Sequence, residues 1–128
     1  MALKLFQLSL LVPDYDDAIS YYTRDLGFIL IKDNFLSPDK RWVVVSPGGE
    51  AGLHILLAKA ANENQKMAIG NQAGGRVFLF LHTDDFDADF ARLTSAGVEF
   101  TRKPVQEAWG KVAVFKDKYG NLWDLIES

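Results

Sequence analysis

The sequence of 128 residues contains no cysteine, which excludes disulfides, thiolate metal sites and cysteine nucleophiles. Basic residues are also few, since 14 lysines and arginines stand against 17 aspartates and glutamates. An acidic chain without a basic stripe is not expected to bind nucleic acid. No apolar run is long enough to span a membrane, and no basic segment followed by an apolar run indicates a signal peptide. We therefore expect a cytoplasmic protein without nucleic-acid or membrane partners.

The sequence does contain enough apolar residues for a core, at 48% hydrophobic and 12% aromatic, and we expect a single domain over residues 1–128. Its periodicity predicts one order of elements twice: a strand, a helix, then three strands. The first set is predicted at residues 3–12, 15–26, 28–32, 41–46 and 52–58, and the second at 76–82, 86–96, 98–102, 112–115 and 122–126. Loops are predicted at residues 34–40 and 103–110.

The second half of the chain repeats the first. Residues 8–27 align with residues 79–97, and residues 42–57 align without a gap with residues 112–127. One such module cannot bury its sheet face alone, so the two are expected to pair. We predict an α+β fold in which two tandem βαβββ modules form a barrel-like cleft. The modules are predicted at residues 1–60 and 76–128, with 61–75 as the connecting segment.

One carboxylate stands out on the last predicted strand, where Asp124 shares a face with Leu122 and Ile126 by the period of two. A carboxylate on an apolar face is unfavourable unless it is paired, hydrogen-bonded or bound to a metal. The repeat relates Asp124 to His54, and Phe78 to Gln7. Three of these four related positions therefore carry side chains able to coordinate a metal. The alternative is a polar cleft without a metal.

The repeat, the strand end Val12-Pro13-Asp14 and the closing run FKDKYGNLWD from Phe115 to Asp124 resemble the vicinal oxygen chelate superfamily. This superfamily includes glyoxalases, bleomycin-resistance proteins and extradiol dioxygenases. The resemblance implies that Gln7, His54 and Asp124 bind one divalent ion, which would be Fe, Mn, Ni or Zn. It also implies catalytic roles for Asp124 and His54, as ligands or as acid and base. Phe78 takes the fourth ligand position, where a phenyl ring cannot coordinate.

The resemblance leaves two main functions open. The first is a small-molecule lyase, isomerase or dioxygenase that depends on the metal. The alternative is a metal-free binding protein of the bleomycin-resistance type that sequesters a drug or metabolite. Both imply a small-molecule ligand, with Trp42, Phe78 and Phe80 as substrate-binding residues. We also expect a homodimer, because short family members commonly build each site from modules of two chains.

A third alternative is a regulatory domain with a vestigial cleft, which a cleft filled by Phe78, Trp42 and Trp123 would favour. Cations at Arg41 and Lys111 are interpreted as solvated surface charges. The acidic run at residues 84–87 is interpreted as the cap of the second helix, because acidic side chains stabilise a helix N-terminus.

Overall fold

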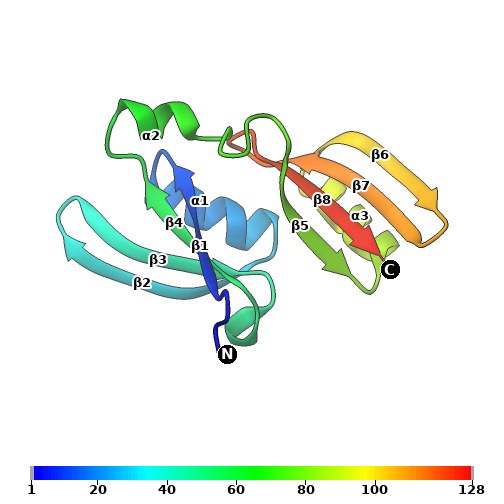
Figure 1. Cartoon of the computed structure of the whole chain (residues 1–128), viewed down its shortest axis with the longest axis horizontal. Helices are drawn as coiled ribbons and strands as arrows, with labels where there is room; N and C mark the ends of the chain where they lie inside the picture. The colour runs from blue at the N-terminus through cyan, green and yellow to red at the C-terminus, as the bar shows by residue number, and fades with distance from the viewer. Residues whose placement is uncertain (1, 128) are drawn as a thin grey trace. The chain divides into compact units, whose positions relative to one another are not determined.

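Each half of the chain forms a four-stranded sheet in the computed structural model, which describes residues 2–127 (Figure 1). Contacts divide the chain into two compact units, the first ending at Ile69 and the second beginning at Gly70. The first unit contains β1 (Gln7–Val12), α1 (Tyr15–Ser20), β2 (Ile29–Ser37), β3 (Lys40–Ser46), β4 (His54–Lys59) and α2 (Glu63–Ala68). The second contains β5 (Val77–Thr83), α3 (Phe86–Ser95), β6 (Glu99–Glu107), β7 (Gly110–Lys116) and β8 (Leu122–Glu127).

The two sheets have the same topology, with strand orders β1-β4-β3-β2 and β5-β8-β7-β6. The first and last strands of each unit are parallel neighbours, and the other neighbouring pairs are antiparallel. The first helix of each unit packs on its own sheet, α1 against β3 and β4, and α3 against β8. This repetition confirms the predicted α+β fold of two βαβββ modules. No helix within residues 2–127 has the length and apolar character needed to cross a membrane.

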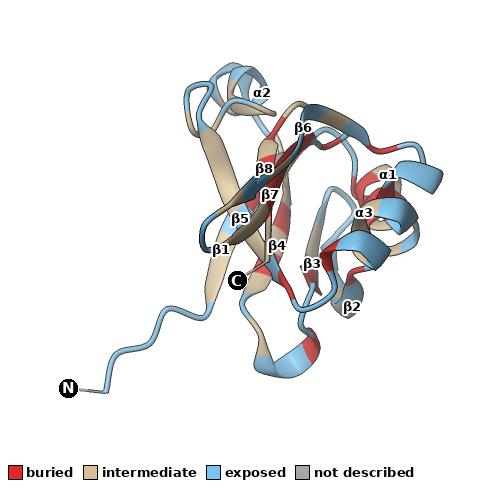
Figure 2. Ribbon diagram, turned by 90° about the vertical axis from the view of Figure 1, so that its right-hand side faces the viewer, coloured by how far each residue is buried: buried red, intermediate tan, exposed pale blue. Residues whose placement is uncertain are grey.

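Asp124 lies on β8, a strand along which half-buried and buried residues alternate (Figure 2). Trp123 and Leu125 are buried, whereas Leu122, Asp124 and Ile126 are half-buried. Successive side chains of a strand point to opposite faces, so these three residues lie together on the less buried face. The predicted orientation of Asp124 is therefore confirmed.

Aspartates cap both main helices, and the cap expected within residues 84–87 is confirmed at Asp85. The carboxylate of Asp14 accepts a hydrogen bond of 2.9 Å from the backbone N–H of Asp17, and Asp85 accepts one of 3.3 Å from Ala88. These bonds satisfy backbone donors that a helix leaves unpaired at its start. The helix predicted at residues 15–26 does not stay α-helical, because a π-helical turn (Tyr21–Asp25) continues α1.

The prediction of loops at residues 34–40 and 103–110 is wrong. β2 extends to Ser37 and meets β3 at Lys40, while β6 extends to Glu107 and meets β7 at Gly110, so both segments are tight hairpins. Edge strands such as β2 and β6 are largely exposed here and lack the apolar alternation that marks a half-buried strand. Pro104 fits in β6 because it lies on an edge strand, at a break in the ladder.

The predicted first strand is also too long, because β1 begins at Gln7 and not at residue 3. Its parallel partner β4 starts at His54, which leaves the preceding residues without a strand to extend beside them. The connecting segment contains α2, whose N-cap Asn62 accepts from the backbone N–H of Gln65 at 2.9 Å.

The gapless alignment of the two hairpins is wrong by two residues. Val44 of β3 pairs with Leu56 of β4, whereas the equivalent Val114 of β7 pairs with Asp124 of β8. The second hairpin is therefore two residues shorter than the first. In sheet position Asp124 corresponds to Leu56, and not to His54 as the alignment indicated.

Candidate ligand-binding site

The first unit contains a pocket of about 630 Å³, lined by residues from the start of β3, the end of β4 and α2. Its apolar wall includes Tyr15, Trp42, Leu56, Leu57 and Ala58. Its polar residues are Asp39, Lys40, Arg41, Lys59 and Gln65. A pocket of this volume, mostly apolar with a few polar groups, has the usual size and character of a small-molecule site.

Trp42 is the largest side chain of this wall and lies half-buried on β3. It shares a sheet face with Val44, which pairs with Leu56 on β4. Trp42 and Leu56 therefore line the pocket from the same face of the sheet. The predicted substrate-binding role of Trp42 agrees with this position but stays a prediction.

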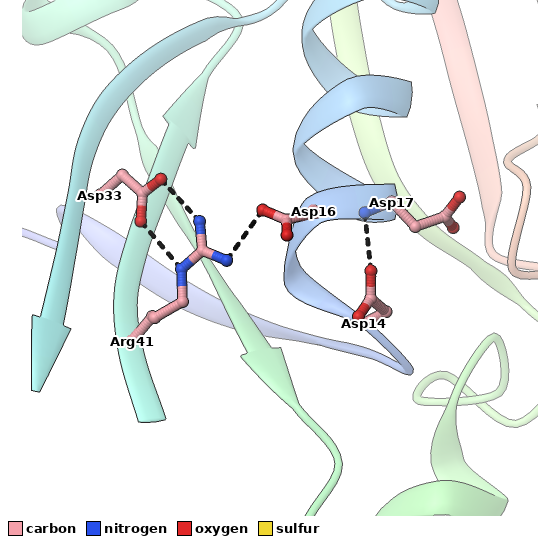
Figure 3. A network of polar contacts seen from close by, with 5 residues as sticks. All are labelled: Asp14, Asp16, Asp17, Asp33 and Arg41. Carbon is pink, nitrogen blue, oxygen red and sulfur yellow. Dashed lines mark hydrogen bonds and ion pairs between the residues drawn. The ribbon is translucent and has the colours of Figure 1, made fainter. Parts of the chain in front are cut away.

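Arg41, the residue before Trp42, is held by two carboxylates (Figure 3). Its guanidinium donates to both oxygens of Asp33, at 3.1 and 2.7 Å, and to Asp16 at 2.8 Å. It also lies over two rings, 4.5 Å from the centroid of Phe35 and 5.3 Å from that of Tyr15. The hydrogen bonds to Asp33 and Asp16 raise the pKa of Arg41 above its ordinary value.

The interpretation of Arg41 as a solvated surface charge is wrong, because its side chain is only 12% exposed and it pairs with two carboxylates, whose charges together exceed its own. The second unit repeats the contact in simpler form. Lys111 donates to Asp87 at 2.7 Å and lies 5.9 Å from the ring of Phe86. Each cation thus ties the start of a β-hairpin strand to the first turn of the helix on its sheet.

Gln65 of α2 presents a donor to the pocket. Its Oε1 accepts a hydrogen bond of 2.7 Å from the backbone N–H of Ala61, which fixes the side-chain amide with its oxygen turned to the chain. The amide N–H groups of Gln65 and the ammonium groups of Lys40 and Lys59 have no acceptor within residues 2–127. No sequence signal indicates this role, since Gln65 and Lys59 belong to no motif.

Gln7 and His54, two of the predicted metal ligands, are register neighbours on the parallel strands β1 and β4. Both are half-buried. His54 Nε2 lies 3.1 Å from the backbone oxygen of Glu50 and must donate there, because a carbonyl only accepts. Nδ1 is then the ring nitrogen left for a ligand or a proton.

Asp124, the third predicted ligand and a predicted catalytic residue, belongs to the second unit, where it pairs with Phe80 on β5 and Val114 on β7. Burial raises the pKa of Asp124, and the charge of Arg102 opposes that rise. Within residues 2–127 no three His, Cys, Asp or Glu side chains form a cluster that could hold a metal. Neither unit alone supplies the predicted ligand set of Gln7, His54 and Asp124.

The other two predicted substrate-binding residues also lie in the second unit. Phe78 lines a smaller pocket of about 120 Å³, beside Arg76, Lys116 and Asn121. Phe80 is 64% exposed on β5. Their roles stay predictions.

A buried carboxylate in the closing run, to which the sequence analysis assigned no role, organises the β7–β8 turn. Asp117 Oδ1 accepts from the backbone N–H groups of Tyr119, Gly120 and Asn121 at 3.0 to 3.1 Å. Its Oδ2 accepts at 2.9 Å from the side chains of Asn121 and Trp123. Five donors offset the desolvation of one charge, so this part of the closing run holds the fold together.

The comparisons with known proteins agree with this fold and define its class. Residues 4–125 match the model of the Glyoxalase/Bleomycin resistance protein/Dioxygenase superfamily, and the chain belongs to this family. An uncharacterized protein of Shewanella frigidimarina (strain NCIMB 400) is 52% identical, covering 99% of this chain and 95% of its own.

Two solved structures are similar over nearly their whole length. UcmS2 has a TM-score of 0.86 and 31% identity, with 100% of both chains covered. TnmS3, described as an antibiotic binding protein from Streptomyces sp. CB03234, has a TM-score of 0.79 and 32% identity, with 99% of this chain and 98% of its own covered.

Proposed function

We propose that this protein is a metal-free binding protein that takes up a small aromatic molecule in the pocket of its first unit and sequesters it unchanged. The observation that carries the proposal is the pocket itself, about 630 Å³ in volume with Trp42 on its wall. An indole face contributes stacking and apolar contact to a flat ligand. Leu56 and Ala58 offer aliphatic surface beside it.

The chemistry of the pocket residues favours binding over turnover. Arg41 is already paired with two carboxylates, and within residues 2–127 no side chain of the pocket lining forms a hydrogen-bonded pair of nucleophile and base. The 32% identity to TnmS3, an antibiotic binding protein by its description, supports a ligand of the antibiotic or metabolite type. A vestigial regulatory cleft is less well supported, because Trp42 borders a pocket of this size and does not fill it.

Binding of 2-naphthol, a neutral planar probe, tests the proposal by isothermal titration calorimetry. Trp42→Ala is expected to weaken binding at least about tenfold, equal to about 1.4 kcal/mol. Trp109→Ala is the matched control, since Trp109 is 55% exposed on a hairpin of the second unit. Recovery of the probe unchanged is also expected. No saturable binding, an equal loss in both variants, or conversion of the probe would contradict the proposal.

A second candidate is the metal-dependent lyase, isomerase or dioxygenase. The specific observation in its favour is that Gln7 and His54 are register neighbours, with His54 Nδ1 left to coordinate. Asp124 would then have to supply the carboxylate to the Fe, Mn, Ni or Zn ion. Metal analysis of untagged protein, before and after chelator, decides between the two. About one ion per chain, lost in His54→Ala, supports the enzyme, whereas metal-free protein that still binds 2-naphthol supports the binding protein.

We further propose that the protein acts in the cytoplasm as a homodimer. Exposed apolar side chains supply surface for self-association, among them Leu5, Phe6, Phe35, Leu36 and Phe80. Light scattering after gel filtration would give twice the 14.3 kDa of one chain for a dimer. A mass of one chain at micromolar concentration would contradict it.

A further inference from the structure

Some of the charged side chains that line the pocket in the first unit are in ion pairs and others are not. Lys40 and Lys59 have no ion-pair partner within residues 2–127, while the charge of Arg41 is satisfied by Asp33 and Asp16. Asp39 is the acidic residue of the lining and lies beside Lys40 in the tight turn between β2 and β3. Arg41 and its two carboxylates together carry one net negative charge, whereas Lys59, at the end of β4, contributes to the pocket a positive charge that is in no ion pair within residues 2–127.

Gln65, like the lysines, offers hydrogen-bond donors to a ligand. Because its oxygen accepts from Ala61, the side of the amide left for a ligand is the N–H side. Lysine ammonium groups also only donate hydrogen bonds. The polar groups that a ligand meets at Lys59 and Gln65 are thus donors, and their natural partner is an oxygen that accepts.

The whole chain has the opposite charge balance, with a net charge of −3. A general field of that sign attracts cations and repels anions. A preference for anions would therefore have to come from the pocket residues and not from the net charge of the chain.

We infer that the pocket selects planar aromatic molecules that carry an anionic oxygen group such as a carboxylate. The ring lies against Trp42 and Leu56, and the anionic oxygens accept from Lys59 and Gln65. This inference rests on the proposed binding function and names the chemical class of its ligand. It differs from a cation-binding site, which would need unpaired carboxylates in place of Lys59.

Two probes with the same ring system and opposite charge test the inference: naphthalene-2-carboxylate and naphthalen-2-ylmethylammonium. Calorimetric titration at about pH 7 and low ionic strength is suitable, because salt screens the charge contribution. We expect the carboxylate to bind at least about tenfold more tightly than the ammonium. Gln65→Leu, which removes the donor, should lower only the affinity for the carboxylate.

A pair of charge-reversal variants separates the pocket from the general field. Lys59→Glu should abolish or reverse the preference. Lys32→Glu makes the same change of net charge on an exposed residue of β2 that does not line the pocket, and should retain it. Equal effects of the two variants, or tighter binding of the ammonium to the wild type, would overturn the inference while leaving the binding function intact. Binding of neither probe nor of 2-naphthol would overturn both.

Discussion

The indole N–H of Trp123 donates a hydrogen bond of 2.9 Å to Asp117 Oδ2, and both residues are buried, at 1% and 3% exposed. Trp123 also stacks on Phe115, with ring centroids 5.8 Å apart. The bond therefore ties the turn to the aromatic core of the second unit. Loss of the carboxylate removes the oxygens to which the indole N–H and three backbone N–H groups donate.

Asp117→Ala is accordingly expected to lower the free energy of unfolding by about 3 kcal/mol or more, because each buried unpaired donor costs roughly 1–3 kcal/mol. Urea denaturation followed by tryptophan fluorescence measures the change. Asp84→Ala makes the same substitution at an exposed position and should shift stability by less than about 0.5 kcal/mol. Equal midpoints for the two variants would show that the Asp117 network contributes little.

The closing run illustrates what the sequence could reveal. Its strands and turn were predictable, because runs of β-branched, aromatic and other apolar residues stand on both sides of a turn that contains a Gly-Asn pair. Asparagine is a residue type that can take a positive φ in such a turn, yet within residues 2–127 only glycines do so. Asn121 instead donates its side-chain amide to Asp117. Such a bond forms only between side chains that are buried together, and the spacing of residues along the sequence does not predict which side chains these are.

The candidate site was less predictable than the fold for a related reason. Trp42 could be singled out as an aromatic residue on a strand. Lys59 and Gln65 could not, because the pocket joins segments between residues 15 and 65 that only the folded unit brings together. The register of Asp124 was missed because a gap of two residues in a turn leaves no mark in a short alignment.

Gly70 and Gly74 form a matched pair for a second prediction. Both have positive φ, 72° and 66°, but a Cβ on Gly70 would collide with the backbone oxygen of Tyr119, whereas one on Gly74 would meet nothing within 4 Å. Gly74→Ala should cost about 1–2 kcal/mol for the backbone conformation alone. Gly70→Ala should cost roughly 1–3 kcal/mol more, because the backbone has to move. Equal losses in chemical denaturation would contradict the close approach.

The contact of Arg41 with Asp16 and Asp33 yields a third prediction. Arg41→Ala should lower stability by roughly 1–2 kcal/mol, because it removes a bidentate pair and the packing of the side chain on Phe35. Lys111→Ala, the equivalent change in the second unit, should have a smaller effect, because Lys111 makes a single ion pair with the exposed Asp87. Thermal unfolding of both variants measures the difference, and a larger loss in Lys111→Ala would refute it.

Asp124 gives a prediction with a definite sign in pH. Burial raises its pKa in the folded protein, so the folded state binds the proton more tightly than the unfolded chain does. At neutral pH the ionised carboxylate therefore lowers stability. Asp124→Asn, neutral and nearly the same shape, should be more stable than the wild type at about pH 7, by less than about 1 kcal/mol.

The advantage of Asp124→Asn should shrink as the pH falls through the raised pKa of the folded-state carboxyl and vanish only below the ordinary aspartate value of about 4, where the wild type is protonated in both states. Urea midpoints of the two proteins between about pH 7 and about pH 3 measure this, with Asp84→Asn as an exposed control that should follow the wild type. A variant less stable than the wild type at neutral pH would reverse the sign. It would mean that the charge of Asp124 makes a favourable contact, with Arg102 or with a bound cation, that outweighs its burial.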